Sequence, residues 1–277
     1  IASEMYAIAC SFGLSAGTNQ SWIEISGLSE NMGKAMEIVE GLIAGAQPNE
    51  EILQNLKGDM IKSRADAKLN QSRCFGALQR YMIYGSDFIR RTTLTDPALQ
   101  GLTSEQLLAK IGDLMGKQHE VLYYGPQDEA EVKAALAAHH KVAADLQPLE
   151  KKFSTLQPTD ENKVMLAQYD AKQLYYMQYS NRGEKFDLAA DPQITLYNEY
   201  FGGGMNTIVF QEMREARGLA YSAWANLAIP TNAKGDYYYM AFIATQNDKM
   251  QKAIEAFDEI INNMPESEKA FDIAKEA

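Results

Sequence analysis

The spacing of apolar residues along this chain changes between two periods, one typical of helices and one typical of strands. Through much of the first half, apolar side chains recur every three to four residues, which predicts amphipathic helices. We expect these helices at 1–9, 31–45, 49–70, 72–85 and 103–116, the last opened by the capping box Thr103-Ser-Glu-Gln106. Shorter apolar runs bounded by turn residues predict strands at 12–17, 21–27 and 120–124.

The second part of the chain mixes the two periods in another order. The alternating runs predict strands at 164–169, 174–179, 219–227 and 236–245. Helical spacing predicts helices at 192–201 and 205–217 and two more near the end of the chain; the glycines at 202–204 break the first and Gly218 ends the second. Strands and helices in this order predict an α+β fold in which a mostly antiparallel sheet is covered by helices on one face.

Two parts of the chain match each other without gaps at an offset of 218 residues. Residues 32–43 correspond to 250–261, and the apolar run at 22–26 corresponds to 240–244. Helical spacing alone could produce part of this match. The shared order of strand, polar turn, helix and proline nevertheless favours a true internal repeat.

The repeat suggests how the chain is organised. Residues 1–126 are expected to be the C-terminal portion of a first repeat, and residues 161–277 the N-terminal portion of a second. Between them, 127–160 is rich in Ala, Lys and Glu and contains prolines, which is typical of a helix followed by an interdomain linker. Each copy lacks a part that the other has. We therefore expect the chain to be a slice across two tandem domains of a longer polypeptide.

Composition and charge exclude some classes of function. Hydrophobic residues make up 46% of the 277 residues, which indicates a globular protein. No apolar run approaches the roughly 20 residues needed to span a bilayer. The net charge of −11 argues against nucleic acid and anionic membrane surfaces as partners. No targeting signal is visible at the start, so the compartment stays open between cytoplasm and, in a bacterium, the periplasm or cell envelope.

The histidines do not form a catalytic zinc motif in the sequence. A catalytic zinc needs three protein ligands, and the chain has three histidines, His119, His139 and His140. His119-Glu120 begins like H-E-x-x-H, but position 123 is Tyr. On a helix, the adjacent His139 and His140 diverge by about 100° and cannot grip one metal as a pair. We expect no metal site here, and we interpret the glycines at 202–204 as a helix break rather than a phosphate loop.

Arg214 and Tyr221 are the candidate functional residues. Arg214 lies on the predicted helix before Gly218, and Tyr221 begins the next strand, so the glycine turn can bring the two side chains together. A guanidinium beside a phenol suits the binding of a substrate carbonyl or carboxylate, or the stabilisation of an oxyanion. From spacing alone, an arginine in a surface ion pair and a tyrosine in the core is the alternative.

The same segment carries a resemblance to a known family. The run Gln211-Glu-Met-Arg214-Glu-Ala-Arg217-Gly-Leu-Ala-Tyr221-Ser, preceded by Asn198-Glu-Tyr-Phe-Gly-Gly-Gly, resembles the helix–strand signature in the second half of the insulinase/pitrilysin-like zinc metallopeptidases. Phe12-Gly-Leu-Ser and the run at 22–26 are similar to the corresponding region of another domain of this type. The resemblance is strong at 194–264 and diffuse at 50–150.

The resemblance implies tandem metallohydrolase-like domains that close around a peptide. It implies a zinc site, H-x-x-E-H with a distal Glu, in an N-terminal half that this chain lacks. Arg214 would then hold the substrate backbone and Tyr221 would support the tetrahedral oxyanion, opposite a zinc ion that acts as Lewis acid. Arg217 would be structural. When Glu4-Met5 is matched to Glu212-Met213, which is an offset of 208 residues, the places of Arg214 and Tyr221 hold Tyr6 and Gly13.

The function expected from the sequence is therefore a non-catalytic, substrate-binding C-terminal half of a zinc metalloendopeptidase. Its partners would be a peptide substrate and the N-terminal catalytic half of the same polypeptide, and this chain alone would be inactive. The alternative is an inactive scaffold or partner-binding subunit of the same fold.

Overall fold

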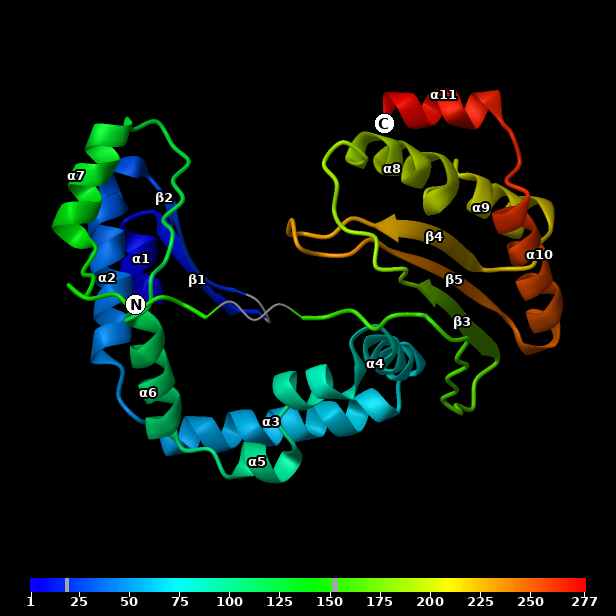
Figure 1. Cartoon of the computed structure of the whole chain (residues 1–277). Helices are drawn as coiled ribbons and strands as arrows, with labels where there is room; N and C mark the ends of the chain where they lie inside the picture. Colours follow the sequence, from blue (N-terminus) through cyan, green and yellow to red (C-terminus); the bar gives the residue numbers. More distant parts are fainter. Residues whose placement is uncertain (18–19, 151–153) are drawn as a thin grey trace. The chain divides into compact units, whose positions relative to one another are not determined.

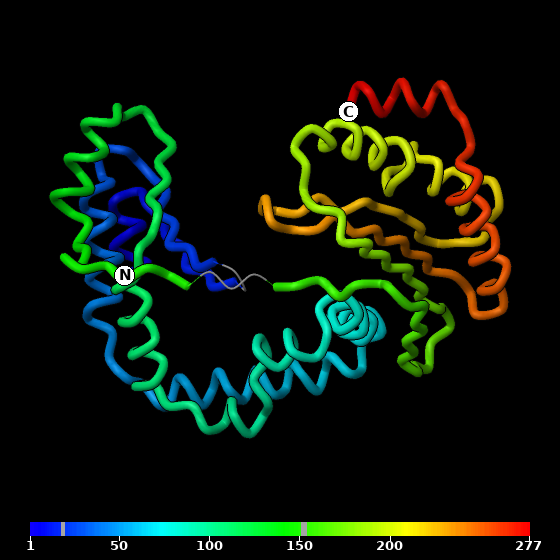
Figure 2. Tube along the Cα trace, viewed as in Figure 1, coloured from blue at the N-terminus to red at the C-terminus, as the bar shows by residue number. Residues whose placement is uncertain are grey.

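The computed structural model describes residues 1–17, 20–150 and 154–277, which form two compact units. Unit 1 comprises Ile1–Ser63 and Thr92–Phe153, and unit 2 comprises Arg64–Arg91 and Ser154–Ala277. Neither unit is continuous in sequence, because the chain leaves unit 1 within a helix and returns to it after the next one, as can be followed along the trace in Figure 2. The repeat boundaries at 126 and 161 remain a prediction about the sequence and are separate from this division by packing.

Unit 1 is built on a two-stranded antiparallel sheet with a small core. Its elements are α1 (Ala2–Ala7), β1 (Cys10–Ala16), β2 (Ser21–Gly27), η1 (Ser29–Asn31), α2 (Met32–Gly45), α3 (Glu50–Lys68), α5 (Asp96–Gln100), α6 (Ser104–Met115) and α7 (Glu129–His139). Strand β1 pairs with β2 from Cys10 opposite Gly27 to Ala16 opposite Ser21. The buried residues Met5, Cys10, Ala35 and Val39 join α1, β1 and α2. Both capping boxes of unit 1, at the starts of α6 and α7, satisfy helix N–H groups that would otherwise lack partners.

A buried lysine joins the helices of unit 1 around α3. Lys57 is only 3% exposed. Its ammonium group donates hydrogen bonds to the carbonyl oxygens of Gln100, at 3.0 Å, and Leu102, at 2.6 Å. Gln100 is the last residue of α5, whose final carbonyl groups have no partner inside the helix. Lys57 thus caps α5 from the neighbouring helix.

Replacing Lys57 with Met is expected to lower the free energy of unfolding of unit 1 by about 1–3 kcal/mol. The substitution keeps an unbranched apolar chain of similar length but leaves the two carbonyl groups without their donor. Urea unfolding followed by the fluorescence of Trp22, in a Trp224→Phe background, measures the change. Lys62→Met, at an exposed position of the same helix, is the matched control. Equal stability of the two variants would contradict the capping role.

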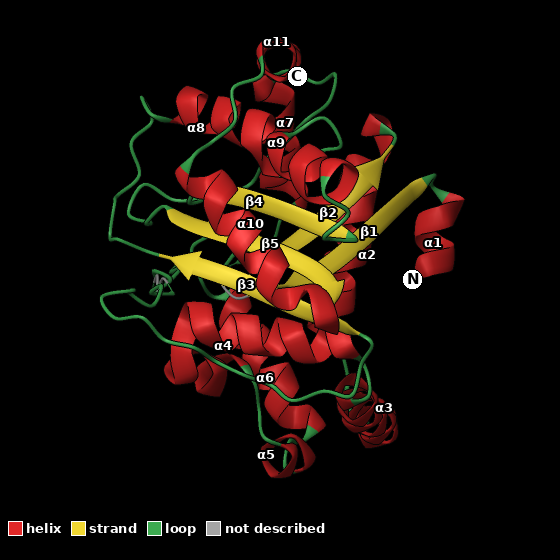
Figure 3. Ribbon diagram, turned by 90° about the vertical axis from the view of Figure 1, so that its right-hand side faces the viewer, coloured by secondary structure: helices red, strands yellow, loops and turns green. Residues whose placement is uncertain are grey.

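Unit 2 contains a three-stranded antiparallel sheet in the order β3-β5-β4. Its elements are α4 (Gln71–Thr92), β3 (Gln173–Ser180), α8 (Asp191–Tyr197), η2 (Asn198–Gly202), α9 (Ile208–Phe210), η3 (Gln211–Ala216), β4 (Ser222–Ala228), β5 (Tyr238–Gln246), η4 (Asn247–Lys249), α10 (Met250–Asn262) and α11 (Glu268–Glu276). Figure 1 shows α8, α9 and α10 along one face of this sheet, and Figure 3 shows α10 lying across the strands.

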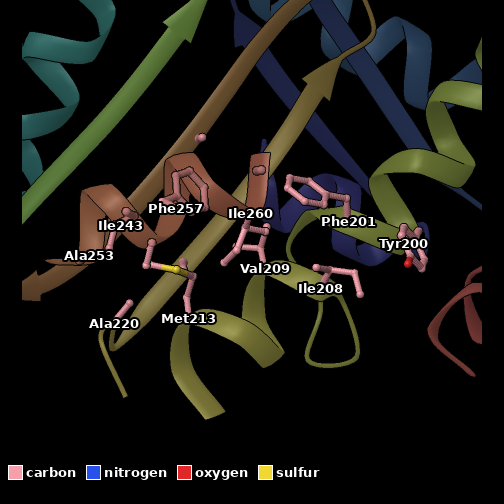
Figure 4. Close-up of a cluster of buried hydrophobic side chains, with 14 of the residues drawn as sticks. Tyr200, Phe201, Ile208, Val209, Met213, Ala220, Ile243, Ala253, Phe257 and Ile260 are labelled. Atoms are coloured by element: carbon pink, nitrogen blue, oxygen red, sulfur yellow. The ribbon is translucent and has the colours of Figure 1, made fainter. Parts of the chain in front are cut away.

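The main hydrophobic core lies between this sheet and the helices α8 to α10. Alternate residues of β4 and β5, Ala223, Ala225, Ala241 and Ile243, point into it, as period-two strands with one buried face require. Large side chains from the helices fill the space above these small residues. Phe201, Met213, Phe257 and Ile260 are all fully buried there, as the close-up in Figure 4 shows.

The predicted fold class is confirmed, but helices cover both faces of the unit 2 sheet rather than one. On the second face, the ring of Phe75 from α4 packs against Tyr175 of β3 and Phe242 of β5, with ring centroids 5.5 and 5.6 Å apart. Helix α4 was expected to end near residue 85. It continues through a kink at Gly85, where φ is +75°, and ends at Thr92.

The internal repeat is visible in the structure. In each unit a helical segment is followed by an antiparallel strand pair, a 3-10 turn and a long helix: α1, β1, β2, η1 and α2 in unit 1, and η3, β4, β5, η4 and α10 in unit 2. The turns and the starts of the long helices keep the offset of 218 residues. Ala35 and Ala253 occupy equivalent positions and are both fully buried, as are Val39 and Phe257.

Two predicted strands are wrong. Residues 120–124 and 164–169 are extended segments that pair with no strand in the described chain. Leu122 and Leu166 are exposed there. An apolar run becomes a strand only where a neighbour completes its hydrogen bonds, and sequence pattern does not reveal whether that neighbour exists.

Among the described helices, none combines the length and apolar character of a membrane span.

Candidate functional site

The chain around Arg214 and Tyr221 turns tightly because one carbonyl group accepts two hydrogen bonds. Arg214 lies on η3, whose neighbouring residue Met213 is fully buried and anchors the helix to the core. After Gly218, which adopts a left-handed φ of +56°, the N–H groups of Leu219 and Ala220 both donate to the Met213 carbonyl, at 2.9 and 3.2 Å. A β-branched or bulky residue at position 218 would be strained in this conformation.

The turn places Tyr221 directly before β4 and beside Arg214. The Tyr221 N–H donates to the carbonyl of Ala244 at 2.9 Å, which joins the residue to β5. The guanidinium carbon of Arg214 lies 5.6 Å from the centroid of the Tyr221 ring and 5.0 Å from that of Phe210. These distances are within the range of cation–π attraction. The structure therefore brings the two candidate residues together.

Both side chains are open to solvent. The side chain of Arg214 is 45% exposed and Tyr221 is 71% exposed, so the alternative of a core tyrosine does not apply. Arg214 has one ionic contact, from Nε to the carboxylate of the adjacent Glu215 at 3.5 Å. Among the described residues, nothing accepts a hydrogen bond from its terminal nitrogens, and nothing bonds the Tyr221 hydroxyl. These donors are available to a ligand.

Arg217 has contacts of a different kind. Its Nη1 donates to Glu259 at 2.7 Å, and its Nε lies 3.5 Å from a carboxylate oxygen of Glu212. The hydrogen bond to Glu259 raises the pKa of the Arg217 guanidinium and lowers the pKa of the Glu259 carboxyl below its ordinary value. Arg217 thus ties η3 to α10 through a terminal nitrogen, whereas the terminal nitrogens of Arg214 have no such partner in the described chain.

Phe210 is a member of this site that sequence reasoning missed. Arg214 lies four residues after Phe210, and residues at this spacing are neighbours on a helix surface. The spacing was therefore a usable signal.

The glycines before the helix are needed for close packing: a Cβ on Gly202 would lie 2.9 Å from the carbonyl oxygen of Ala225. This contact fits the interpretation of residues 202–204 as a packed helix break.

The sequence equivalents of the site in unit 1 are different. Tyr6, at the position of Arg214, is 85% exposed on α1, and Gly13 lies within β1. Unit 1 thus lacks the pairing of a guanidinium with a phenol at these places. As for metals, no group of three or more His, Cys, Asp or Glu residues in the described chain is arranged to hold an ion.

Comparison with solved structures places the fold among peptidases. The structure of a peptidase M16 inactive domain from Pseudomonas fluorescens superposes with a TM-score of 0.71 at 18% identity, covering 99% of this chain and 67% of that one. The ferredoxin protease FusC, solved as a mutant in complex with Arabidopsis ferredoxin, gives 0.76 at 10% identity. The periplasmic protease PqqL from Escherichia coli gives 0.70 at 15% identity.

The chain spans only 30% of the length of FusC and of PqqL, while 99% and 98% of this chain is covered. At these identities the similarity shows the fold. A search of curated protein sequences found no match. The sequence model of the peptidase M16 inactive domain matches residues 102–277. This match covers more than half of the chain and confirms the resemblance to the insulinase/pitrilysin-like peptidases: the chain belongs to the peptidase M16 family and carries its inactive domain.

Proposed function

We propose that this chain is the non-catalytic, substrate-binding part of a zinc-dependent metalloendopeptidase, and that Arg214 and Tyr221 contact the peptide. The observation that carries the proposal is the exposed pairing of the two side chains, with the guanidinium 5.6 Å from the phenol ring and its terminal nitrogens unpaired within the described chain. At the end of the same helix, Arg217 forms ion pairs with two carboxylates. An arginine with only a structural role would be expected to look like Arg217.

The chemistry of the pair suits a peptide backbone. The guanidinium of Arg214 presents several N–H donors in a fixed plane, which fits a peptide carbonyl or a terminal carboxylate. The Tyr221 hydroxyl can donate one hydrogen bond to an oxygen on which negative charge develops during bond cleavage. The stacking on Phe210 and Tyr221 restrains the arginine side chain, so part of its ordering is complete before the substrate arrives.

The relatives support a polypeptide as the ligand. FusC was solved in complex with a protein, ferredoxin. Its fold matches 99% of the length of this chain. By analogy we propose a peptide or an extended protein segment as the substrate class. Both side chains of the site are exposed on unit 2, where a peptide can reach them.

The described residues of this chain do not fit the zinc ion that such a peptidase requires. They form no group of three ligands, and Arg214 and Tyr221 are hydrogen-bond donors rather than metal ligands. We therefore assign the catalytic metal to an N-terminal half of the parent polypeptide. The contribution of this chain is limited to binding and orienting the peptide and to donating hydrogen bonds.

The experiment that tests the proposal measures cleavage of an unstructured fluorogenic peptide by the intact parent polypeptide and by this 277-residue chain. We expect the parent to cleave the peptide, a chelator to abolish the cleavage, and added zinc to restore it. The chain alone should be inactive but should bind the peptide, as measured by fluorescence anisotropy. Folded, zinc-supplied parent that cleaves nothing would refute the proposal and favour the inactive scaffold or partner-binding subunit.

A further inference from the structure

Two histidines of unit 1 meet at a place remote in sequence from Arg214 and Tyr221. His140 directly follows α7, which packs against α2. His119 lies in the segment after α6, and this segment is fixed by two backbone hydrogen bonds: Gln118 N–H donates to the Gln147 carbonyl at 2.8 Å, and Gln147 N–H donates to the Gly116 carbonyl at 2.9 Å. The Nε2 atoms of His119 and His140 lie 2.9 Å apart.

The other ring nitrogen of each histidine is already committed as a donor. In His119, Nδ1 lies 3.0 Å from the carbonyl oxygen of Lys117, which can only accept. In His140, Nδ1 lies 2.5 Å from Oε1 of Glu40. The second oxygen of Glu40 accepts the Lys141 N–H at 2.8 Å, so both oxygens of Glu40 are in use. Both rings therefore donate from Nδ1.

When both rings are neutral, the two Nε2 lone pairs face each other. In a neutral imidazole, the nitrogen opposite the protonated one is an acceptor, and two acceptors 2.9 Å apart repel. A positive charge between them removes the repulsion. The ring planes stand nearly at right angles, with an interplanar angle of 77°.

The surroundings of the pair are those of metal-binding histidines. Such histidines usually donate the other ring N–H to a carboxylate or a backbone carbonyl, which fixes the tautomer and raises the basicity of the ligand. Here Glu40 does this for His140, and the Lys117 carbonyl does it for His119. In a tetrahedral zinc site, two nitrogens about 2.0–2.1 Å from the ion lie about 3.3 Å apart. A separation of the rings by a few tenths of an ångström would thus admit the ion.

We propose that His119 and His140 form a two-histidine site for a divalent late transition-metal ion, with zinc as the ion and water in the remaining positions. Imidazole nitrogen is a ligand that zinc, copper and nickel share. His119 is exposed, so water can complete the coordination. The site would tie the end of α7 to the segment after α6 within unit 1. It is separate from the catalytic zinc assigned to the other half and does not depend on the proposed peptide site.

The sequence itself contains a matched control. His139 is adjacent to His140 and also donates from Nδ1 to a carboxylate of α2, Glu37, at 3.0 Å. Its ring packs against Gly33, and neither this contact nor the one with Glu37 involves His119. Removing His139 therefore removes an imidazole and a similar ion pair without touching the proposed site.

The site is tested by titrating the tag-free 277-residue chain with ZnCl₂ and measuring the heat of binding by calorimetry. A second titration, with CuCl₂, is monitored by electron paramagnetic resonance, which reports the type of ligand atom. We expect one Zn²⁺ per chain and a Cu²⁺ spectrum with nitrogen hyperfine coupling. His119→Gln and His140→Gln should each weaken zinc binding at least about tenfold, and Glu40→Gln should weaken it about 10–100-fold as the loss of an outer-shell partner. His139→Gln should bind like the unaltered chain.

Two results would overturn the proposal. One is the absence of stoichiometric zinc binding by the folded chain, together with an imidazole NMR spectrum in which one of the two rings carries protons on both nitrogens. A shared proton would then supply the positive charge. The other is zinc binding that His139→Gln weakens as much as His140→Gln does, which would indicate dispersed surface sites. Circular dichroism of each variant confirms that it is folded.

Discussion

Arg214→Ala or Tyr221→Phe, each introduced into the intact parent polypeptide, is expected to lower kcat/KM for peptide cleavage by about 10²–10³. This is the range for losing one preorganised donor to a developing oxyanion. The Tyr221 change removes only the hydroxyl oxygen and keeps the ring on which Arg214 stacks, so it isolates the hydrogen bond from the packing. Steady-state kinetics with the fluorogenic peptide measures the effect.

The division of the effect between kcat and KM distinguishes the two roles. If Tyr221 acts on charge that develops in the transition state, the variant lowers kcat and leaves KM nearly unchanged. If Arg214 holds the substrate backbone in the ground state as well, its removal raises KM too. We therefore expect the loss to lie mainly in kcat for Tyr221→Phe and to be shared for Arg214→Ala.

Tyr6→Phe is the matched control for these variants. Tyr6 is another exposed tyrosine of the same chain, at the place in unit 1 that corresponds to Arg214 in the repeat. Its hydroxyl has no assigned role, and its loss should leave kcat/KM unchanged. Wild-type turnover by both site variants would exclude the assignment of Arg214 and Tyr221, even if the parent proves to be a peptidase.

Local sequence signals predicted much of the fold because the elements within each repeat follow one another closely along the chain. The helix from Met250 to Asn262 and the strand pair before it have strong periodicity, and their match to the first repeat gave a second, independent indication. The closeness of Arg214 to Tyr221 was also a local inference, since it follows from the turn at Gly218. Short-range geometry is what a sequence without homologues can supply.

The features that sequence analysis missed all depend on distant partners. Segment 164–169 has the alternation of a strand but pairs with none in the described chain, so it stays extended and exposed. Helix α4 packs on the unit 2 sheet about a hundred residues further along the chain, through Phe75. His119 and His140 are 21 residues apart and meet only because backbone hydrogen bonds and the packing of α7 place them together. Periodicity contains no information about such pairings.

The exposure of Arg214 and Tyr221 could not be predicted from the sequence either. Spacing could place Arg214 near Tyr221 but could not show whether the arginine was free or paired. In the structure, Arg217 and not Arg214 forms ion pairs with Glu212 and Glu259, because both carboxylates lie beside the Arg217 guanidinium. Which of two arginines three residues apart remains available is decided by one acidic residue of the same helix and one of another helix, α10.

Phe257→Ala is expected to lower the free energy of unfolding of unit 2 by about 3–5 kcal/mol. Phe257 is fully buried on α10, in the same core cluster as the small residues of β4 and β5, and Figure 4 shows its ring among the buried side chains. Removing a large core ring forfeits its burial and leaves a cavity that the surrounding packing only partly fills. The equivalent residue of unit 1 is the smaller Val39, in a smaller core.

The two tryptophans of the chain allow the change to be assigned to one unit. Trp224 lies on β4 in unit 2, and Trp22 lies on β2 in unit 1. In a Trp22→Phe background, urea unfolding followed by fluorescence reports unit 2. The control is Phe271→Ala, which removes the same ring from α11, where it is 42% exposed. Its effect should stay below about 1 kcal/mol, because an exposed ring forfeits little burial when it is removed. A loss for Phe257→Ala no larger than the loss for Phe271→Ala would contradict the core described for unit 2, and with it the anchoring of Met213 that holds Arg214 beside Tyr221.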